Sequence, residues 1–201
     1  KPLARFCSLA VALLSFGKPE SAEALLETLQ AIDQHPLGMD TRVLVKSLAY
    51  AGSGNINQIH ELLGILQQCN LERKQREDRK RQEDRAKAEN RTASTPSEQE
   101  PVQYESLAPI LAVLGVALIS VSEEIGQEMA LRMFNHVMHY GDAPVRRTVP
   151  LAIALLFASH PTLPVMDTLS KFSHDSDKSV AVNAVLAMGV EPVPLVSDRE
   201  Q

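Results

Sequence analysis

Apolar and polar positions along this chain recur with the period of a helix. In the stretch that follows Gly17, one face is apolar and the opposite face is polar, a pattern typical of a surface helix. The apolar set is Ala22, Leu25, Leu26, Leu29 and Ile32, and the polar set is Glu20, Glu23, Glu27 and Gln30. A second stripe of this kind follows Gly52 and is formed by Ile56, Ile59, Leu62, Leu63 and Leu66. Since no segment alternates convincingly with a period of two, the pattern predicts an all-α protein.

Between these amphipathic stretches lie segments of a second kind, which are rich in Ala, Leu and Val and end at a small residue. They read SLAVALLSFG, VKSLAYAG, VLGVALISVS and LAIALLFAS, and they end at Gly17, Gly52, Ser122 and Ser159. The first two ends lie 35 residues apart and the last two lie 37 apart. Self-similarity with this period is the signature of a helical repeat array.

Two successive stretches, YGDAPVRRTVPLAIALL from Tyr140 and FSHDSDKSVAVNAVLAMG from Phe172, also match at an offset of 35 residues. The match aligns Asp142 with Asp177, and both are expected to be N-caps of successive helices. A two-helix unit of about 35 residues cannot bury its apolar face alone, so neighbouring units must stack. The sequence therefore predicts an α-solenoid, with apolar inner helices and amphipathic outer helices.

The repeats divide the chain into four parts. Residues 1–70 are predicted to form two helical-hairpin repeats, and residues 104–190 two to three more. Residues 71–103 alternate charges and lack an apolar stripe, so we expect a disordered insertion there, either a solvated loop or a fraying single helix. Residues 191–201 are read as a divergent tail. The chain opens inside an apolar helical pattern, without a helix start signal, so we expect it to be part of a longer protein.

Composition and charge narrow the functional classes. Aromatic residues make up 4% of the chain and Trp is absent, and this composition disfavours an aromatic-lined ligand pocket. The net charge is −5, with +3 in residues 71–91 and −8 in the remainder, which disfavours nucleic acid as the main partner. No signal peptide is visible, and the apolar runs are too short to span a membrane. The two cysteines, Cys7 and Cys69, are expected to be reduced packing residues of an intracellular protein.

Candidate chemical sites are few, and each has a better structural explanation. His174 and Asp175 with Asp177 offer one imidazole and two carboxylates, which suit capping of a helix better than catalysis or a metal. His136 and His139 share a helix face but lack an identifiable third ligand. The GSGN sequence at 52–55 closes one helix and opens the next, and it is not a phosphate loop. No catalytic residue, metal site or cofactor is predicted.

Several longer strings resemble a known family. EEIGQEMALR, HYGD, VRRTVPLA and DTLSKFSHD, with AYAGSGN nearer the N-terminus, resemble the proteasome/cyclosome repeats of a ubiquitin-receptor scaffold in the proteasome regulatory particle. The resemblance covers roughly residues 3–70 and 104–190 and implies a segment of a toroidal α-solenoid without catalytic activity. Two regions depart from the family pattern: the insertion is short and Arg-rich, and the tail after Gly189 matches nothing in it.

The resemblance also implies partners and a location. The partners would be the proteasome ATPase ring and other regulatory-particle subunits, ubiquitin and ubiquitin-like shuttle factors, and a deubiquitinase, with no nucleic acid and no membrane. The expected location is the cytoplasm and the nucleus. In this family, acidic outer helices receive ubiquitin-like domains, whose binding surfaces are apolar patches ringed by Lys and Arg. The residues proposed for such contacts are Glu20, Glu23, Glu27, Asp33 and Glu61.

Three alternatives stay open at this point. The acidic stripe is also consistent with an ordinary solvated helix face. The chain also fits a HEAT-like adaptor of another multiprotein complex. A third reading is an enzyme whose active site lies outside the sequence printed above.

Overall fold

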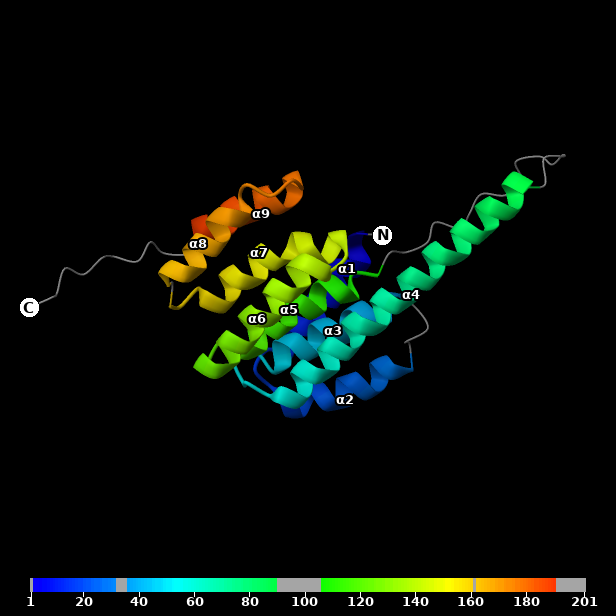
Figure 1. Cartoon of the computed structure of the whole chain (residues 1–201). Coiled ribbons are helices and arrows are strands. Elements are labelled where there is room, and N and C mark those ends of the chain that lie inside the picture. Colours follow the sequence, from blue (N-terminus) through cyan, green and yellow to red (C-terminus); the bar gives the residue numbers. More distant parts are fainter. Residues whose placement is uncertain (1, 32–35, 90–105, 161, 191–201) are drawn as a thin grey trace, which may run out of the picture.

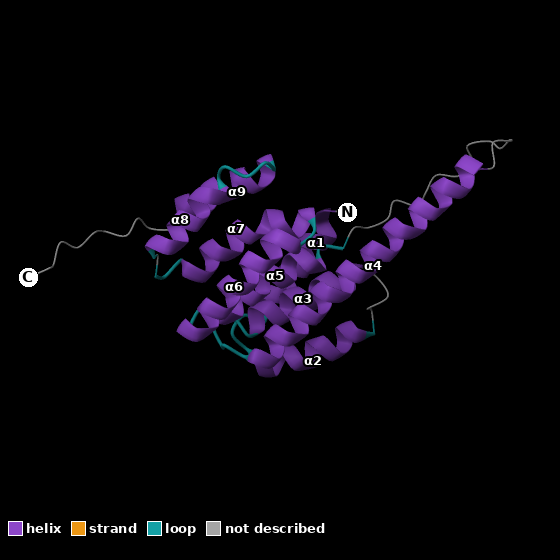
Figure 2. Cartoon of the chain, in the orientation of Figure 1, coloured by secondary structure: helices purple, strands orange, loops and turns teal. Residues whose placement is uncertain are grey.

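The structure is a computed structural model that describes residues 2–31, 36–89, 106–160 and 162–190. Within these ranges all regular structure is helical, which confirms the predicted all-α class (Figure 2). The described helices are α1 (Pro2–Leu14), α2 (Pro19–Gln30), α3 (Pro36–Ala49), α4 (Ile56–Glu89), α5 (Ala108–Ser120), α6 (Glu124–Tyr140), α7 (Ala143–Phe157), α8 (Leu163–Phe172) and α9 (Lys178–Val190).

The helices form two layers of a solenoid (Figure 1). The odd-numbered helices pack side by side in one row, each against the next odd-numbered helix. The even-numbered helices form the outer layer, and each packs against the inner helix that follows it in the sequence. Helices α6 and α8 also contact the inner helix that precedes them. The predicted α-solenoid of inner and outer helices is therefore confirmed.

The inner helices α5 and α7 are apolar on most sides because neighbours cover them on most sides. Their buried residues are Ala108, Ala112, Val113, Gly115, Val116, Ala117, Ile119 and Ser120 on α5, and Val145, Thr148, Val149, Pro150, Ala152, Ile153, Ala154, Leu156 and Phe157 on α7. The outer helix α6 instead buries one stripe, formed by Ala130, Phe134, Val137 and Met138. An amphipathic helix such as α6 therefore belongs to the outer layer, whereas helices that are apolar on most sides, such as α5 and α7, belong to the inner row.

The helices at the two ends of the row expose apolar side chains. On and just after α1 these are Leu3, Phe6, Leu9, Leu13, Leu14 and Phe16, and on α9 they are Val182, Val185, Leu186 and Val190. Cys7, which the sequence predicts to pack, is exposed on α1 because no described helix covers that face. Cys69 is half-buried against the main core, as predicted.

Glycines at two corners connect successive inner helices through the backbone. Gly17, Gly52 and Gly54 have positive φ angles of 66°, 69° and 62°, a conformation that favours glycine. The Gly17 amide donates a hydrogen bond to the Leu48 carbonyl (3.2 Å) at the end of α3. Gly52 and Gly54 donate to the carbonyls of Leu118 (2.8 Å) and Ile119 (2.9 Å) near the end of α5. These bonds satisfy carbonyl groups that the end of a helix leaves free.

Ion pairs connect neighbouring units at the opposite edge, where the inner helices begin. The Arg146 and Arg147 side chains on α7 contact Asp175 (3.6 Å) and Asp177 (2.9 Å) at the start of α9. Asp177 is an N-cap, as predicted, because its carboxylate accepts the Ser179 amide (2.9 Å). Asp142 occupies the N-cap position of α7, but its side chain makes no capping hydrogen bond.

The charged insertion begins as a continuation of α4. The sequence placed a boundary after residue 70, whereas α4 runs across that position without interruption and ends at Glu89. The first part of the continuation is stabilised by side-chain pairs four residues apart, Arg73 with Glu77 (3.2 Å) and Arg76 with Glu72 (3.7 Å). None of the helices that the structure describes is both long and apolar enough to cross a membrane. Residues 90–103 and the predicted tail 191–201 lie outside the described residues.

Stacking of the inner helices leads to a prediction about Gly115. A Cβ at this position would lie 3.0 Å from Leu62 Cδ1 and 2.9 Å from Ser47 Cβ. Gly115→Ala is therefore expected to lower the free energy of unfolding by about 1–3 kcal/mol, measured by urea denaturation. Gly64→Ala on α4 is the matched control, since its Cβ would meet no neighbouring atom within 4 Å. The control is expected to stabilise the protein by about 0.5–1 kcal/mol. Equal effects of the two substitutions would contradict the close α3–α5 packing.

The ion pairs at the α7–α9 edge predict a pH dependence. A hydrogen bond from Arg147 and one from the Ser179 amide lower the pKa of Asp177 below its ordinary value of 3.8. The carboxylate therefore stabilises the fold above about pH 4, and this contribution is lost as the pH falls through the lowered pKa. Asp177→Asn keeps a capping acceptor but removes the charge, so it should melt at a lower temperature than the parent at pH 7.

The difference in melting temperature should shrink as the pH is lowered below 4. Asp78→Asn, on the exposed continuation of α4, controls for the change in net charge. A difference that persists unchanged at pH 2.5 would show that Asp177 does not act through its ionised form.

Candidate partner-binding surface

The predicted acidic stripe lies on the solvent side of α2. Glu20, Glu23 and Glu27 are all exposed, as their helical spacing predicts. The helix is oriented by its opposite face, where Ala22 is fully buried in a small core together with Ala12, Val45 and Ala49. Leu25, Leu26 and Leu29 of α2 pack against the same core. The three carboxylates therefore stand on a rigid helix and are not needed for its packing.

Tyr50, at the end of α3, connects the acidic face of α2 with α4. Its half-buried ring packs against both apolar cores of the protein. Burial raises the pKa of the Tyr50 hydroxyl, and the negative charges of Glu23 on α2 and Glu61 on α4 raise it further. Glu23 is also placed to accept a hydrogen bond from this hydroxyl. Two of the predicted contact residues, far apart in sequence, are thus gathered around one tyrosine.

Glu61 already has a partner of its own. Its carboxylate forms an ion pair with the ammonium group of Lys46 on α3. The Lys46 side chain is 11% exposed, whereas the Glu61 side chain is 50% exposed, so the cation lies beneath the surface. Lys46 therefore offsets the charge that Glu61 presents to solvent. The remaining predicted contact residue, Asp33, lies outside the described residues.

The structure adds Tyr50 and Lys46 to the predicted surface. Tyr50 belongs to the AYAGSGN string, which carries the family resemblance and marks the end of a helix but does not by itself indicate a contact residue. Lys46 is a single cation within the apolar segment VLVKSLA, where a buried charge needs an ionic partner. Because Lys46 is the only charged residue in this apolar segment, its ion pair with an acidic side chain could have been predicted from the sequence. The identity of the partner depends on how α4 lies over α3.

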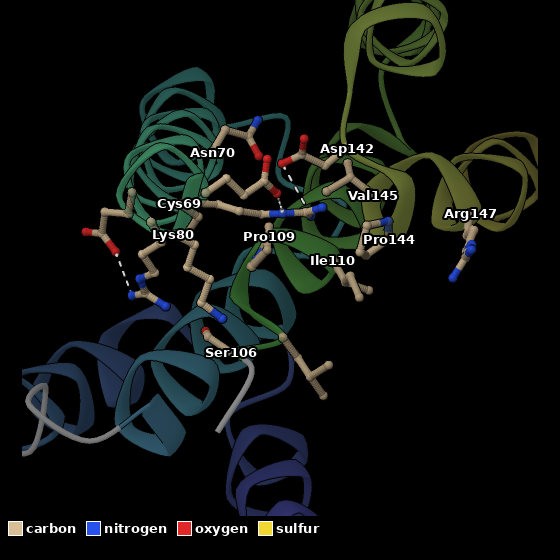
Figure 3. A pocket seen from close by; sticks show the side chains of 15 residues that line it. Cys69, Asn70, Lys80, Ser106, Pro109, Ile110, Asp142, Pro144, Val145 and Arg147 are labelled. Carbon is tan, nitrogen blue, oxygen red and sulfur yellow. Dashed lines mark hydrogen bonds and ion pairs between the residues drawn. The ribbon is translucent and has the colours of Figure 1, made fainter. Parts of the chain in front are cut away.

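A second feature is a hollow between α4 and the first turns of α5 and α7 (Figure 3). Its volume is about 600 Å³, and its apolar residues include Pro109, Ile110, Pro144 and Val145. Asp142 faces α4 across this hollow and contacts Arg73 at 3.5 Å. Arg73 also contacts Glu77 (3.2 Å), so the guanidinium is shared by two carboxylates. The hollow is lined by charges that largely neutralise one another, and we assign no ligand to it.

The residues considered for catalysis or metal binding have structural surroundings. Within the described ranges, no group of three or more His, Cys, Asp or Glu side chains is placed to hold a metal ion. His136 packs against the ring of Tyr140 on α6, with a centroid distance of 4.8 Å. Asp175 accepts the Asp177 amide (2.8 Å) at the corner before α9. Burial, and then the neighbouring Glu72 and Asp40, raise the pKa of the Cys69 thiol, which disfavours the reactive thiolate.

Comparison with known proteins identifies close relatives in several eukaryotes. The chain is 42% identical over 186 residues to 26S proteasome regulatory subunit rpn-1 of Neurospora crassa, and 39% identical over 186 residues to rpn1 of Schizosaccharomyces pombe. It is 35% identical over 187 residues to 26S proteasome non-ATPase regulatory subunit 2 of Dictyostelium discoideum. These matches cover 92%, 92% and 93% of the chain. No family model matches the chain.

The matched region is only a part of each relative. The chain spans 18% of the length of the Neurospora and Schizosaccharomyces proteins and 17% of the Dictyostelium protein. The similarity therefore relates this chain, with its repeats, to one segment of each of these proteins.

The surroundings of Tyr50 predict how stability changes in alkali. A raised pKa in the folded state means that the unfolded chain ionises first, so folding is penalised as the pH rises above about 10. Tyr50→Phe keeps the packing but cannot ionise. At pH 7 its free energy of unfolding should lie within about 1 kcal/mol of the parent. Above pH 10 it should retain more stability than the parent.

The measurement is urea denaturation of the two proteins at pH 7, 9 and 11. Tyr140→Phe serves as the control, because Tyr140 is 79% exposed on α6. A parallel pH dependence of Tyr50→Phe and the parent would mean that the pKa of this hydroxyl is not raised, either by burial or by Glu23 and Glu61.

Proposed function

Because this chain belongs to the family of 26S proteasome non-ATPase regulatory subunit 2, of which it matches one segment, we propose that it is part of a non-catalytic scaffold of the proteasome regulatory particle. The names of the relatives describe regulatory subunits, which favours this role over a HEAT-like adaptor of another complex and over an enzyme. Within the scaffold, the chain contacts other regulatory-particle subunits and the ATPase ring. The cytoplasm and the nucleus are the corresponding locations.

The second part of the proposal is that the acidic face of α2 docks ubiquitin and the ubiquitin-like domains of shuttle factors. The observation that carries it is the group of three exposed carboxylates beside a half-buried tyrosine. Ubiquitin-like surfaces present an apolar patch ringed by Lys and Arg. Carboxylates complement the basic ring, and the Tyr50 side chain offers an aromatic contact of the kind enriched at protein interfaces.

Rigidity of the surface supports this use. Helix α2 is fixed by its buried Ala22 and by the leucines packed on α3. A partner that docks there therefore pays little conformational entropy to order the receptor. A deubiquitinase recruited to the same scaffold would act on ubiquitin chains held by this face.

A charge reversal on α2 tests the docking proposal. Glu23→Arg together with Glu27→Arg replaces attraction by repulsion; it removes the acceptor of the Tyr50 hydroxyl but leaves Ala22 and the packed leucines of α2 unchanged. Exposed ion pairs are individually worth about 0.2–1 kcal/mol, whereas hot-spot contacts exceed about 2 kcal/mol. The affinity for a ubiquitin-like domain is therefore expected to fall about tenfold or more, measured by fluorescence titration. Binding of the parent should also weaken with salt, as the Debye length falls from about 10 Å at 0.1 M to about 3 Å at 1 M.

The matched control is Asp78→Arg with Asp167→Arg, at two exposed positions on α4 and α8, which changes the net charge equally. Helicity of both double variants should equal that of the parent. Unchanged affinity after the α2 reversal would leave this face as an ordinary solvated surface. Membership in the regulatory particle is tested separately, by asking whether the tagged protein co-purifies with regulatory-particle subunits in stoichiometric amounts.

A further inference from the structure

The ion pair of Lys46 on α3 and Glu61 on α4 is an exception among the repeat units. Lys46 lies six residues before Gly52, the small residue at the end of its inner segment, and Glu61 lies nine residues after it. The same two positions can be counted from the ends of the other inner segments, at Gly17, Ser122 and Ser159. They hold Val11 with Leu26, Val116 with Leu131, and Ile153 with Thr168. One unit thus has opposite charges where the other three have uncharged residues.

The fold does not require a charge at this position of the inner row. Val116 on α5 and Ile153 on α7 are buried in the main core, so an apolar side chain fits the equivalent site. The Lys46 side chain is 11% exposed, and removal of an ammonium group from water is costly even when the group is paired. Replacement of a covered ion pair by apolar residues is often neutral or stabilising. Stability therefore does not explain why this unit has an ion pair.

The ion pair borders the acidic face of α2. Tyr50, one helical turn after Lys46, lies between the two: burial raises the pKa of its hydroxyl, and the charges of Glu23 and Glu61 raise it further. Both carboxylates therefore act on one surface, although they belong to different outer helices. Glu61 would extend the acidic face from α2 onto α4 if its charge were unpaired. The ammonium group of Lys46 lies beneath it and offsets that charge.

We propose that Lys46 is a specificity-determining residue of the docking surface, because it confines the negative charge of that surface to α2. This inference rests on the proposed docking of ubiquitin-like domains by the acidic face. A partner with cations over Glu23 and Glu27 is attracted, whereas cations over the start of α4 meet a carboxylate that is already neutralised. The surface thereby selects where the basic residues of a partner must lie. It also keeps the affinity below the value that an unpaired Glu61 would give.

The test replaces Lys46 by methionine, which keeps an unbranched side chain but removes the charge. The Glu61 side chain is 50% exposed, so its carboxylate stays hydrated without a partner and the variant should fold. We expect Lys46→Met to bind a fluorescently labelled ubiquitin-like domain about twofold to fivefold more tightly than the parent, the effect of one exposed charge contact. The affinity of the variant should also fall more steeply with salt than that of the parent.

A second variant shows whether the gain in affinity comes from Glu61. Lys46→Met with Glu61→Gln removes both charges, so its affinity should return to about that of the parent. Lys171→Met, at an exposed position on α8 near the other end of the solenoid, controls for the change in net charge (Figure 1). The control is expected to bind as the parent does. Circular dichroism should show the parental helicity in all three variants.

Stability gives a readout that does not involve a partner. Lys46→Val with Glu61→Leu introduces the residues that the next unit has at these positions, Val116 and Leu131. This variant is expected to melt at a temperature no lower than that of the parent. A clearly lower melting temperature would show that the fold needs the ion pair and would overturn the inference.

The docking proposal and the role of Lys46 fail in different ways. If reversal of Glu23 and Glu27 leaves the affinity unchanged, docking on α2 is wrong and the role of Lys46 is wrong with it. If that reversal weakens binding but Lys46→Met binds no more tightly than the parent, only the role of Lys46 is wrong. Weaker binding by Lys46→Met would mean that the ammonium group holds Glu61 in place for a partner, which also contradicts a neutralising role.

Discussion

The stacking of the first three inner helices, α1, α3 and α5, depends on a backbone contact that is made twice. At two successive corners, a glycine with positive φ donates its amide to the end of the following inner helix, first Gly17 to Leu48 and then Gly52 to Leu118. The contact fixes the height of α3 relative to α1 and that of α5 relative to α3. It also requires close approach of the helices, which is why the inner row is built from Ala, Gly, Ser and Val. The outer helices are then free to carry different surfaces on one common frame.

That freedom explains how one repeat architecture presents unlike faces. Helix α2 carries carboxylates over a packed leucine stripe, α4 continues into a polar arm with charge pairs four residues apart, and α6 exposes the apolar side chains of Ile125 and Met129. In each case the buried stripe packs the outer helix against the inner row, and the exposed positions are not constrained by that packing. In such a solenoid the outer helices can therefore carry different surfaces, whereas the inner row sets the fold.

The helical class, the two layers and the small-residue ends of the inner helices were predictable, because each follows from spacing along the chain. The exposure of Glu20, Glu23 and Glu27 followed from the same spacing. Pairing across helices was not predictable, since the contact of Lys46 with Glu61 depends on where α4 crosses α3. Asp142 shows the same limit: its position predicted a cap, but Arg73, which reaches it from the charged insertion, binds its side chain instead.

The hydrogen bond from Gly52 to Leu118 joins residues that lie much farther apart in sequence than the partners Gly17 and Leu48. Closure entropy grows slowly with the length of the intervening chain, by about 0.6 kcal/mol per doubling, so the longer separation costs little at equilibrium. Its effect is on the order of events during folding. Contacts of high sequence separation tend to form late, so we expect the α3–α5 interface to form after the contacts within each half. We therefore expect this chain to fold as two helical blocks that dock, whereas an uninterrupted array can extend one unit at a time from any nucleus.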